Sequence, residues 1–533
     1  MRAERAKDER EGRGVNGRVL VPFAAGAVVL VLLALHAWWT CDDAYIAFRY
    51  SRNLAEGLGL RFNLGVDPPV EGYTQLGWVL WFALLEKLPV DAIVVGHASE
   101  IAAGVGLVLA FVLAAQRRGH GALATGLGAI FLASSPTAVV WSTGGLGTMP
   151  FALLIFLVAE RLWGNGGRPR WASGTALACL LAYWRFDAFY WLGLIFGFAL
   201  LACWSREDGA VALDRTRLRR WLASVGVLGA AIGAQTAWRL AYHGDWLPNT
   251  ARAKVGMSAQ SLERGVDYLL TYWSTVPATL VLLVALVALA LTTRRAWWIG
   301  SALLVLATFA YGVLTGGDFM AMGRFYLPAL PFLALAASAM FQRLVARGRT
   351  PVAAISALAL VGLSAPALFD LHAVPQSVRE AVQFRWGRPY ESEIVYKRGM
   401  AERAERWGRV GRALALHTDP SESLVRGSIG AVGYHSRMYI HDMFGLVNRE
   451  VATGVEVQEM TMPGHDRIAP VDFFAPWEPT YRSARLVMGA ERVERERAKQ
   501  AALSPEERER HRVFEVSTAD GFEEDGLLVL ERF

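Results

Sequence analysis

The chain has 533 residues, of which 54% are hydrophobic, and its mean hydropathy is +0.29. This composition excludes an ordinary soluble protein and indicates one that crosses a membrane several times. The net charge of +6 and the pI near 9.2 do not indicate a nucleic-acid partner, because the arginines cluster in short loops between apolar segments.

The first apolar segment, residues 19–40, is long enough to cross a bilayer as a helix. No small-residue cleavage site follows it, so we expect an anchor rather than a signal peptide. The segment 76–88 is too short to span, and we expect it to be interfacial or re-entrant. We predict about eleven transmembrane helices, at residues 19–40, 97–115, 122–141, 149–163, 171–184, 188–204, 219–241, 268–292, 296–315, 325–345 and 351–370.

Alternate loops between these segments carry arginines, which predicts that this side is cytoplasmic, together with the N-terminus. These arginines lie at 117–118, 161–170, 215–220, 294–295 and 343–349. The other loops then face outward, and an odd number of spans places the C-terminal region outside as well. The outward loops hold most of the polar clusters of interest, at 41–96, 142–145, 185–187, 243–254 and 316–324.

The composition changes after residue 371, where the chain becomes polar and free of spans. Residues 425–434 and 438–440 are typical of short strands, and 527–531 of a final strand. Residues 490–512 predict a charged helix pair that is broken near Pro505. We therefore predict a membrane domain over 1–371, with a first outer loop at 41–96, and a soluble α/β domain over 372–533 on the outer face.

Asp42 and Asp43 directly follow the first apolar segment. A charge inside hydrocarbon is costly, so the pair is expected to mark the membrane surface. Residues 43–56 are expected to form a helix that lies in the interface plane. Two interpretations stay open: one aspartate is a helix N-cap, or the pair acts as a general base or as a ligand of Mg²⁺ or Mn²⁺.

Three cations in the outward loops are candidates for binding a phosphate. Arg185 lies beside Asp187 at a break between two predicted spans, and Arg324 follows Asp318 in a glycine-rich turn. The pair Arg185 and Asp187 is equally interpreted as a structural ion pair, and Asp318 as part of a tight outer turn, whereas Lys254 would act as a point charge. The sequence has no Walker A or GxGxxG motif before a helix, so a nucleotide donor is not indicated.

A set of short runs, in chain order, resembles bacterial C-type (GT-C) glycosyltransferases, and among them the mycobacterial terminal arabinofuranosyltransferases. The resemblance covers most of the chain. It rests on the runs DDAYIAFRYSRNLAEGLGLRFN, VEGYT, HGDWLPNTARAK, GGDFM, GRFYLP, DMFGLVNRE and PGHD.

The resemblance implies a GT-C-like membrane enzyme of the bacterial plasma membrane. It would transfer a sugar, with arabinofuranose as first candidate, from a polyprenyl-monophosphate donor to a glycan or lipid-linked acceptor hydroxyl on the outer face. It implies that an aspartate of the first outer loop is the catalytic base, carried onto Asp42 and Asp43 with a slight preference for Asp43. It also implies a set of substrate-binding residues: Tyr45, Arg49, Glu71, Tyr73, Arg185, Asp187, Asn249, Lys254, Asp318, Arg324 and His465.

The chain departs from the family at residues 145–147, where it reads Gly-Leu-Gly instead of the family's Gly-Leu-Glu. The missing carboxylate leaves the identity of the sugar and of the acceptor open. A transporter or flippase for a lipid-linked sugar or polar solute is an alternative, although no inverted repeat is visible. A membrane scaffold with an outer binding domain is a further alternative.

Overall fold

The computed structural model describes residues 2–164, 169–207, 210–253, 258–385, 389–458 and 462–533. The chain forms two compact units, each assembled from three separate stretches. Unit 1 contains Met1–Trp39, Ile93–Thr236 and Gly256–Lys397, and unit 2 contains Thr40–Ala92, Ala237–Val255 and Arg398–Phe533. The loop that carries the aspartate pair therefore folds with the C-terminal region.

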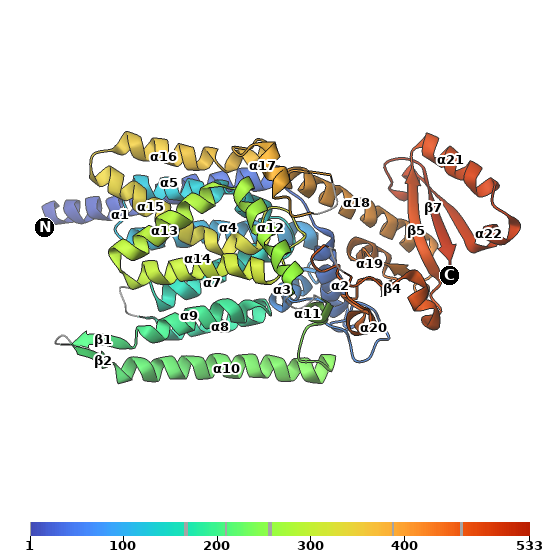
Figure 1. Cartoon of the computed structure of the whole chain (residues 1–533), viewed down its shortest axis with the longest axis horizontal. Coiled ribbons are helices and arrows are strands. Elements are labelled where there is room, and N and C mark those ends of the chain that lie inside the picture. Colours follow the sequence, from blue (N-terminus) through green and yellow to red (C-terminus); the bar gives the residue numbers. More distant parts are fainter. Residues whose placement is uncertain (1, 165–168, 208–209, 254–257, 386–388, 459–461) are drawn as a thin grey trace. The chain divides into compact units, whose positions relative to one another are not determined.

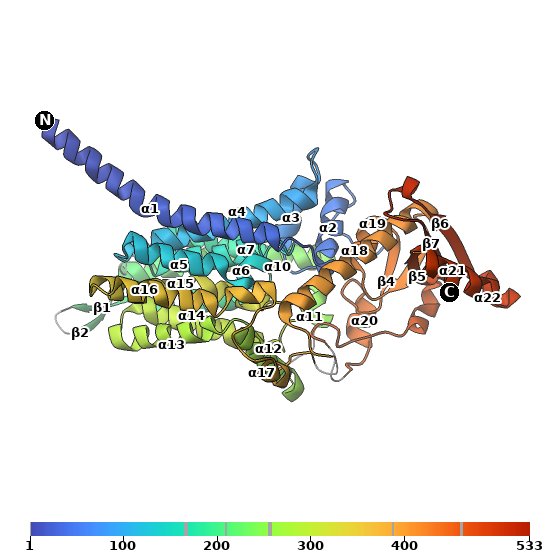
Figure 2. The ribbon, with the colours of Figure 1, turned by 90° about the horizontal axis from the view of Figure 1, so that it is seen from above.

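Unit 1 is a bundle of apolar helices (Figures 1 and 2). Within it α5 packs against α1, α15 and α16, and α14 packs against α9, α12 and α13. A short antiparallel hairpin, β1 (Trp204–Glu207) and β2 (Ala210–Leu213), precedes α10. The helices are α1 (Arg2–His36), α4 (Ala92–Arg117), α5 (Ala122–Ser134), α6 (Pro136–Val140), α7 (Thr148–Leu162), α8 (Trp171–Trp184), α9 (Ala188–Leu201), α10 (Arg215–His243), α12 (Ala259–Thr275), α13 (Ala278–Thr293), α14 (Ala296–Leu314), η1 (Arg324–Ala329), α15 (Leu330–Ala346), α16 (Thr350–Gly362), η2 (Ala365–Phe369) and α17 (Gln376–Ala381).

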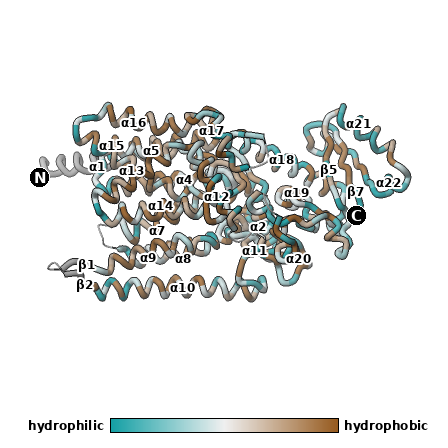
Figure 3. The backbone as a smooth tube through the Cα atoms, in the orientation of Figure 1, coloured by the Kyte–Doolittle hydropathy of each residue, from teal (hydrophilic) through white to brown (hydrophobic). Residues whose placement is uncertain are grey.

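Several helices of unit 1 have the length and composition needed to cross a membrane, as their colouring in Figure 3 shows. Within the described residues these are Gly17–His36, Ala92–Arg117, Ala296–Leu314, Arg324–Ala346 and Thr350–Phe369, and the bent pair α12 and α13 makes a sixth if it is one span. The protein is thus a multi-pass membrane protein, while the total of eleven spans stays a prediction.

Two of the expected spans are each divided between two α-helices, and proline is the reason in both. The segment 268–292 was expected to be one helix, but α12 and α13 meet at a bend of 99° beside Pro277. In the segment 122–141, α5 ends at Ser134 and α6 begins at Pro136. Proline has no N–H to donate and restricts the preceding residue, so a helix ends just before it.

Unit 2 combines a five-stranded mixed sheet with short helices, and this confirms a small mixed α/β fold in the C-terminal region. The strand order is β4-β3-β5-β7-β6; β3 is parallel to β4 and β5, and β7 is antiparallel to β5 and β6. Helices α10 and α18 begin in unit 1 and continue into unit 2. The elements are α2 (Asp42–Ala55), α3 (Leu76–Leu85), α11 (Asn249–Ala253), α18 (Glu393–His417), β3 (Ser423–Arg426), α19 (Gly430–Ser436), β4 (Tyr439–Asp442), α20 (Arg449–Gly454), η3 (Val471–Trp477), β5 (Tyr481–Met488), α21 (Ala490–Ala501), α22 (Pro505–Arg510), β6 (His511–Val516), η4 (Thr518–Asp520) and β7 (Gly526–Arg532).

The expected strand at 425–434 is wrong in its second half, because β3 ends at Arg426 and α19 begins at Gly430. The chain packs so closely here that a Cβ on Gly430 would lie 1.9 Å from the Asp42 carbonyl oxygen. The expected helix pair is confirmed as α21 and α22. The second of these helices begins with a capping box from Ser504, followed by Pro505.

Helix α2 confirms the helix expected over 43–56 and packs against α3 and α19. Its apolar face includes Ile46 and Phe48, both buried. The ring of Phe48 stacks on that of Phe82 in α3, with centroids 4.1 Å apart. Burial of this face holds the first turn of α2, which contains both aspartates, in a fixed position within unit 2.

Candidate functional site

The carboxylate of Asp42 is held by the first turn of α19. It accepts hydrogen bonds from the backbone N–H of Gly430 at 3.2 Å and of Ala431 at 2.8 Å. Burial raises the pKa of Asp42 from its ordinary 3.8 to about 6, although these two bonds oppose the shift, and the neighbouring charge of Asp43 adds to it. Asp42 therefore titrates close to neutral pH.

Asp43 follows in the same helical turn and is partly exposed. The N-cap interpretation is wrong for both aspartates, because the N-cap of α2 is Cys41. Both carboxylates instead occupy the first helical positions, where the positive end of the helix dipole favours an anion. Both aspartates are partly exposed, and backbone amides of α19 bind both oxygens of Asp42.

The expected metal site at this pair has a weak donor set. Both oxygens of Asp42 already accept backbone hydrogen bonds. Among the residues that the structure describes, no group of three or more histidine, cysteine, aspartate or glutamate side chains is placed to hold a metal ion. The residues present do not make a metal centre by themselves, so the mechanism below uses none.

Arg49 and Tyr45 of α2 contact other parts of unit 2. The buried guanidinium of Arg49 donates to the carbonyl oxygens of Gly433 at 3.0 Å and Met438 at 2.8 Å. The Tyr45 ring lies against that of Tyr434, with centroids 5.5 Å apart. Arg49 thus joins α2 to the segment between α19 and β4, and its role in binding substrate stays a prediction.

Glu71, in the VEGYT run, forms a buried ion pair with Arg239 of α10 at 2.6 Å. The Glu71 carbonyl oxygen also accepts the N–H of Asn249 at 2.9 Å. The side chain of Asn249 in turn donates to the carbonyl oxygen of Gly445 at 2.6 Å. This network fastens the first loop to two distant stretches of the chain.

Arg239 was missed by sequence reasoning because it lies inside the segment 219–241 that was expected to span. A lone cation within an apolar segment is itself a signal of a buried partner. Tyr73 and His243 lie next to this pair, with the Tyr73 hydroxyl 3.4 Å from His243 Nε2. His243 Nδ1 contacts the carbonyl oxygen of Pro69 at 2.8 Å.

Asp442 and His465 flank a tight turn after β4. The Asp442 carboxylate accepts the N–H of Phe444 at 2.8 Å and of Val447 at 2.9 Å, and burial raises its pKa to about 6. The His465 ring packs edge-on against Phe444, with centroids 4.5 Å apart. His465 therefore lies beside the DMFGLVNRE run, as part of unit 2.

In unit 1, the structure brings two of the predicted outer loops together. Arg185 donates to both oxygens of Asp187 at 2.9 and 2.8 Å, and the hydroxyl of Tyr311 donates to the same carboxylate at 2.9 Å. Arg324 forms an ion pair with Asp318 at 2.8 Å. The ring of Tyr311 contacts Phe325, next to Arg324, with centroids 5.3 Å apart.

The ion-pair interpretation of Arg185 is therefore confirmed. Arg324 also forms an ion pair, which the sequence did not predict, and neither pair excludes phosphate binding. Each guanidinium also lies over an aromatic ring, Arg185 at 4.7 Å from the centre of Phe151 and Arg324 at 5.4 Å from that of Trp141. Lys254, the third expected cation, lies outside the described residues.

The backbone of the loop at 145–147 is hydrogen-bonded to a carboxylate of another helix. Glu100 of α4 is buried and accepts the N–H of Gly145 at 2.8 Å and of Gly147 at 2.7 Å. Gly147 has φ of 65°, a left-handed conformation that a glutamate adopts poorly. Sequence reasoning missed Glu100, although an acidic residue within a predicted span is a recognisable signal.

Comparisons with known proteins support the architecture. A family model described as a domain of unknown function (DUF8728) matches residues 393–502, and no curated protein matches the sequence. The structure is similar to ArnT from Cupriavidus metallidurans bound to undecaprenyl phosphate, with 14% identity, 96% of this chain and 98% of that chain covered, and a TM-score of 0.53. The structure of the same ArnT in the apo state is 15% identical to this chain, with 96% of this chain and 97% of that chain covered and a TM-score of 0.55.

A third solved structure, the oligosaccharyltransferase of Archaeoglobus fulgidus in the apo form, has 11% identity, covers 79% of this chain and 64% of that chain, and gives a TM-score of 0.48. At these identities the likeness to ArnT concerns the fold. That likeness extends over nearly the whole of both chains, and it shows that this chain has an ArnT-like fold.

Proposed function

We propose that this protein is a membrane glycosyltransferase. It moves a sugar from a polyprenyl-monophosphate donor to a hydroxyl of a cell-envelope glycan or lipid-linked acceptor, on the outer face of a bacterial plasma membrane. The observation that carries the proposal is the carboxylate pair at the start of α2, in which the amides of α19 hold Asp42 and Asp43 is partly exposed. The fold likeness to ArnT, solved with undecaprenyl phosphate, supports a lipid-linked donor.

The transfer needs one base and a way to stabilise the departing phosphate. The acceptor oxygen attacks C1 of the donor sugar, its proton passes to Asp43, and the bond between C1 and the phosphate oxygen breaks. The electron pair of that bond leaves with the polyprenyl phosphate. Asp42 positions the first turn of α2, because both of its oxygens already accept backbone hydrogen bonds.

Arg185 and Arg324 are the cations that we assign to the leaving phosphate. In the structure each neutralises an aspartate, Asp187 and Asp318 respectively. A guanidinium binds a phosphate in the same bidentate manner as a carboxylate, so each arginine is able to exchange its partner for the phosphate as charge develops. Arabinofuranose is the sugar that we propose first, on the family resemblance alone.

The test is sugar transfer by the purified full chain from polyprenyl-phosphoryl arabinofuranose to a short arabinan acceptor. Loss of a general base lowers a rate by about 10²- to 10⁴-fold, which is the loss expected for Asp43→Asn at an unchanged melting temperature. Asp42→Asn is the matched control, with a smaller loss of rate and a lower melting temperature. Full activity of a folded Asp43→Asn variant would overturn the assignment of the base.

If the folded wild-type protein transfers no arabinofuranose, other polyprenyl-phosphate sugars are tested in the same assay. If none of these is transferred, the glycosyltransferase proposal fails. Flux of a lipid-linked sugar in proteoliposomes, without product, would then favour the transporter alternative.

A further inference from the structure

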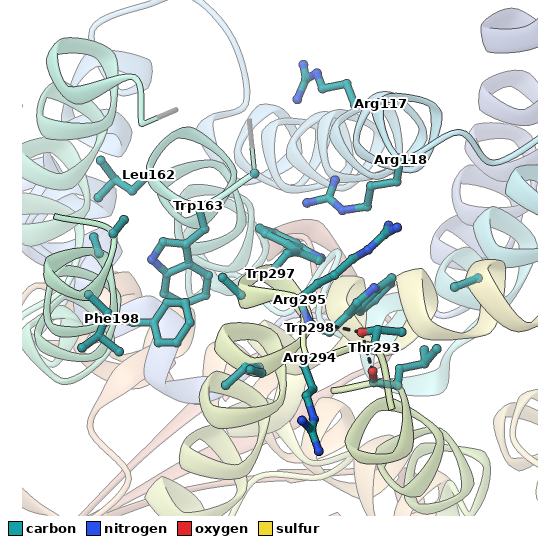
Figure 4. Close-up of a pocket in the computed structure, with 18 of the residues that line it drawn as sticks. Arg117, Arg118, Leu162, Trp163, Phe198, Thr293, Arg294, Arg295, Trp297 and Trp298 are labelled. Carbon is teal, nitrogen blue, oxygen red and sulfur yellow. Dashed lines mark hydrogen bonds between the residues drawn. The ribbon is translucent and has the colours of Figure 1, made fainter. Parts of the chain in front are cut away.

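Unit 1 contains a cavity of about 1250 Å³ that none of the candidate site residues lines. It lies where α4, α7 and α13 end, where α14 begins, and beside the end of α15, as Figure 4 shows in part. Its lining contains residues from all five arginine-bearing loops that the sequence assigns to the cytoplasmic side, and arginines from four of them: those at 117–118, 215–220, 294–295 and 343–349. Loops far apart in the sequence thus surround one space.

Positive charge dominates this lining, which contains six arginines and no acidic residue. Three of the arginines have acidic partners nearby. Arg117 and Arg118 share Glu160, at 3.3 and 2.6 Å, and Arg217 pairs with Asp214 at 3.0 Å. The cavity therefore keeps an excess of positive charge, from the other three arginines and from the two that share Glu160.

Those three are Arg294, Arg295 and Arg343, and their guanidinium groups form no hydrogen bond or ion pair with any residue that the structure describes. Arg294 has φ of 52°, in the left-handed region, at the C-cap of α13. Glycine is the usual residue in that conformation, because it has no Cβ to clash. An arginine is thus retained at a backbone position that disfavours it.

The rest of the wall is aromatic and apolar. The Trp163 ring contacts Phe198 and Trp297, with centroids 5.1 and 6.1 Å apart, and Arg118 stacks on Trp297 at 3.7 Å (Figure 4). Helix α14, which supplies Trp297, is long and apolar enough to cross a membrane and exposes apolar side chains such as Leu303. The cavity thus combines cations and an apolar wall at the end of membrane helices, where lipid headgroups lie.

We propose that this cavity binds an anionic phospholipid by its phosphate headgroup. The guanidinium groups of Arg294, Arg295 and Arg343 contact the phosphate oxygens, for which arginine geometry is well suited. The acyl chains follow the apolar wall towards the outer surface of α14. Basic pockets between membrane helices on the cytoplasmic side bind anionic headgroups by this combination of charge and apolar contact. This inference does not depend on the proposed function.

The test measures binding of phosphatidylglycerol to the purified full chain in detergent by native mass spectrometry. The test variant is Arg294→Gln/Arg295→Gln/Arg343→Gln. The matched control is Arg220→Gln/Arg347→Gln/Arg349→Gln, which removes the same charge from exposed positions of neighbouring loops that do not line the cavity. We expect about 100-fold weaker binding by the test variant and less than about threefold by the control.

Phosphatidylcholine and glycerol phosphate identify the ligand chemistry. We expect weak binding of phosphatidylcholine, which has no net charge, and no competition by glycerol phosphate at concentrations that match the lipid. If both triple variants lose phosphatidylglycerol binding equally, the lipid is attracted by positive charge in general and not by the cavity. That result would overturn the proposal. Equal binding of phosphatidylcholine, or full competition by glycerol phosphate, would overturn it too. If the triple variant does not fold, Arg343→Glu on the exposed face of α15 gives the same comparison.

Discussion

The polar groups of the first loop in unit 2 and those of the outer loops in unit 1 have different partners. In unit 2, Asp42 and Arg49 bond to the main chain. In unit 1, Arg185 and Arg324 pair with aspartate side chains and lie over aromatic rings. Main-chain partners cannot rotate away, whereas side-chain pairs are able to open. Main-chain amides thus fix Asp42 in unit 2, whereas carboxylate side chains hold Arg185 and Arg324 in unit 1.

The strongest exception to this comparison is the Glu71–Arg239 pair, a side-chain pair of unit 2 whose two side chains are only 2% and 3% exposed. Glu71→Gln leaves the Arg239 charge buried without its partner, and we expect a loss of about 3–5 kcal/mol in the free energy of unfolding. The measurement is thermal unfolding in detergent.

The exposed Glu56–Arg437 pair supplies the control, since Glu56 and Arg437 are 36% and 58% exposed. Glu56→Gln should change stability by less than about 1 kcal/mol. The double variant Glu71→Leu/Arg239→Met should recover most of the loss. Similar effects of Glu71→Gln and Glu56→Gln would contradict a buried pair.

Variants of Gly147 test whether hydrogen bonds to the main chain also fix the conformation of a loop in unit 1. Gly147→Ala places a Cβ at a left-handed φ and should lower the free energy of unfolding by about 1–2 kcal/mol. Gly147→Glu adds a second carboxylate near buried Glu100, so its loss should be larger, although glutamate is the residue at this position in the glycosyltransferases that the sequence resembles. Thermal unfolding of both variants measures whether Gly147→Glu lowers stability more than Gly147→Ala. An increase in stability with glutamate would show that the loop accepts the family pattern.

The pH dependence of the free energy of unfolding tests whether Asp42 titrates with a raised pKa. Its folded-state pKa of about 6 lies above the ordinary 3.8, so the folded state favours the protonated form. Its contribution to stability is fully present below about pH 4 and is lost as the pH rises through about 6. Wild type should therefore lose roughly 1 kcal/mol relative to Asp42→Asn between about pH 5 and pH 7.

Asp442, whose pKa is also raised to about 6, is present in both of these proteins and cancels in the difference. The measurement is chemical or thermal unfolding at several pH values. A difference between wild type and Asp42→Asn that stays constant with pH would show that Asp42 is not the titrating group.

The smallest effect is expected from a chelator. Since no group of three or more ligand side chains is placed for a metal among the described residues, transfer should stay within about twofold when EDTA is added. The measurement is the transfer assay with and without EDTA, with added Mg²⁺ as the control. Loss of activity in EDTA that Mg²⁺ restores would show that a metal joins the aspartate pair.

Local patterns in the sequence predicted much of this protein. Long apolar segments identified a membrane protein, and short-range signals identified α2, the pair α21 and α22, and strands β4 and β7. These features depend on neighbouring residues and on simple periodicity, so they are readable without a fold. The strand expected over 425–434 was wrong in its second half, because α19 depends on close packing against Asp42.

The sequence by itself determined which residue types are available at the candidate site, and tertiary structure decided their partners. Asp42 meets Gly430, which lies 388 residues later, and Glu71 meets Arg239 across 168 residues. Glu100 reaches the loop at 145–147 from another helix. No local pattern encodes such contacts, because they arise only when distant segments pack and their buried polar groups must find partners. The same packing anchors Asp42 to the main chain of α19.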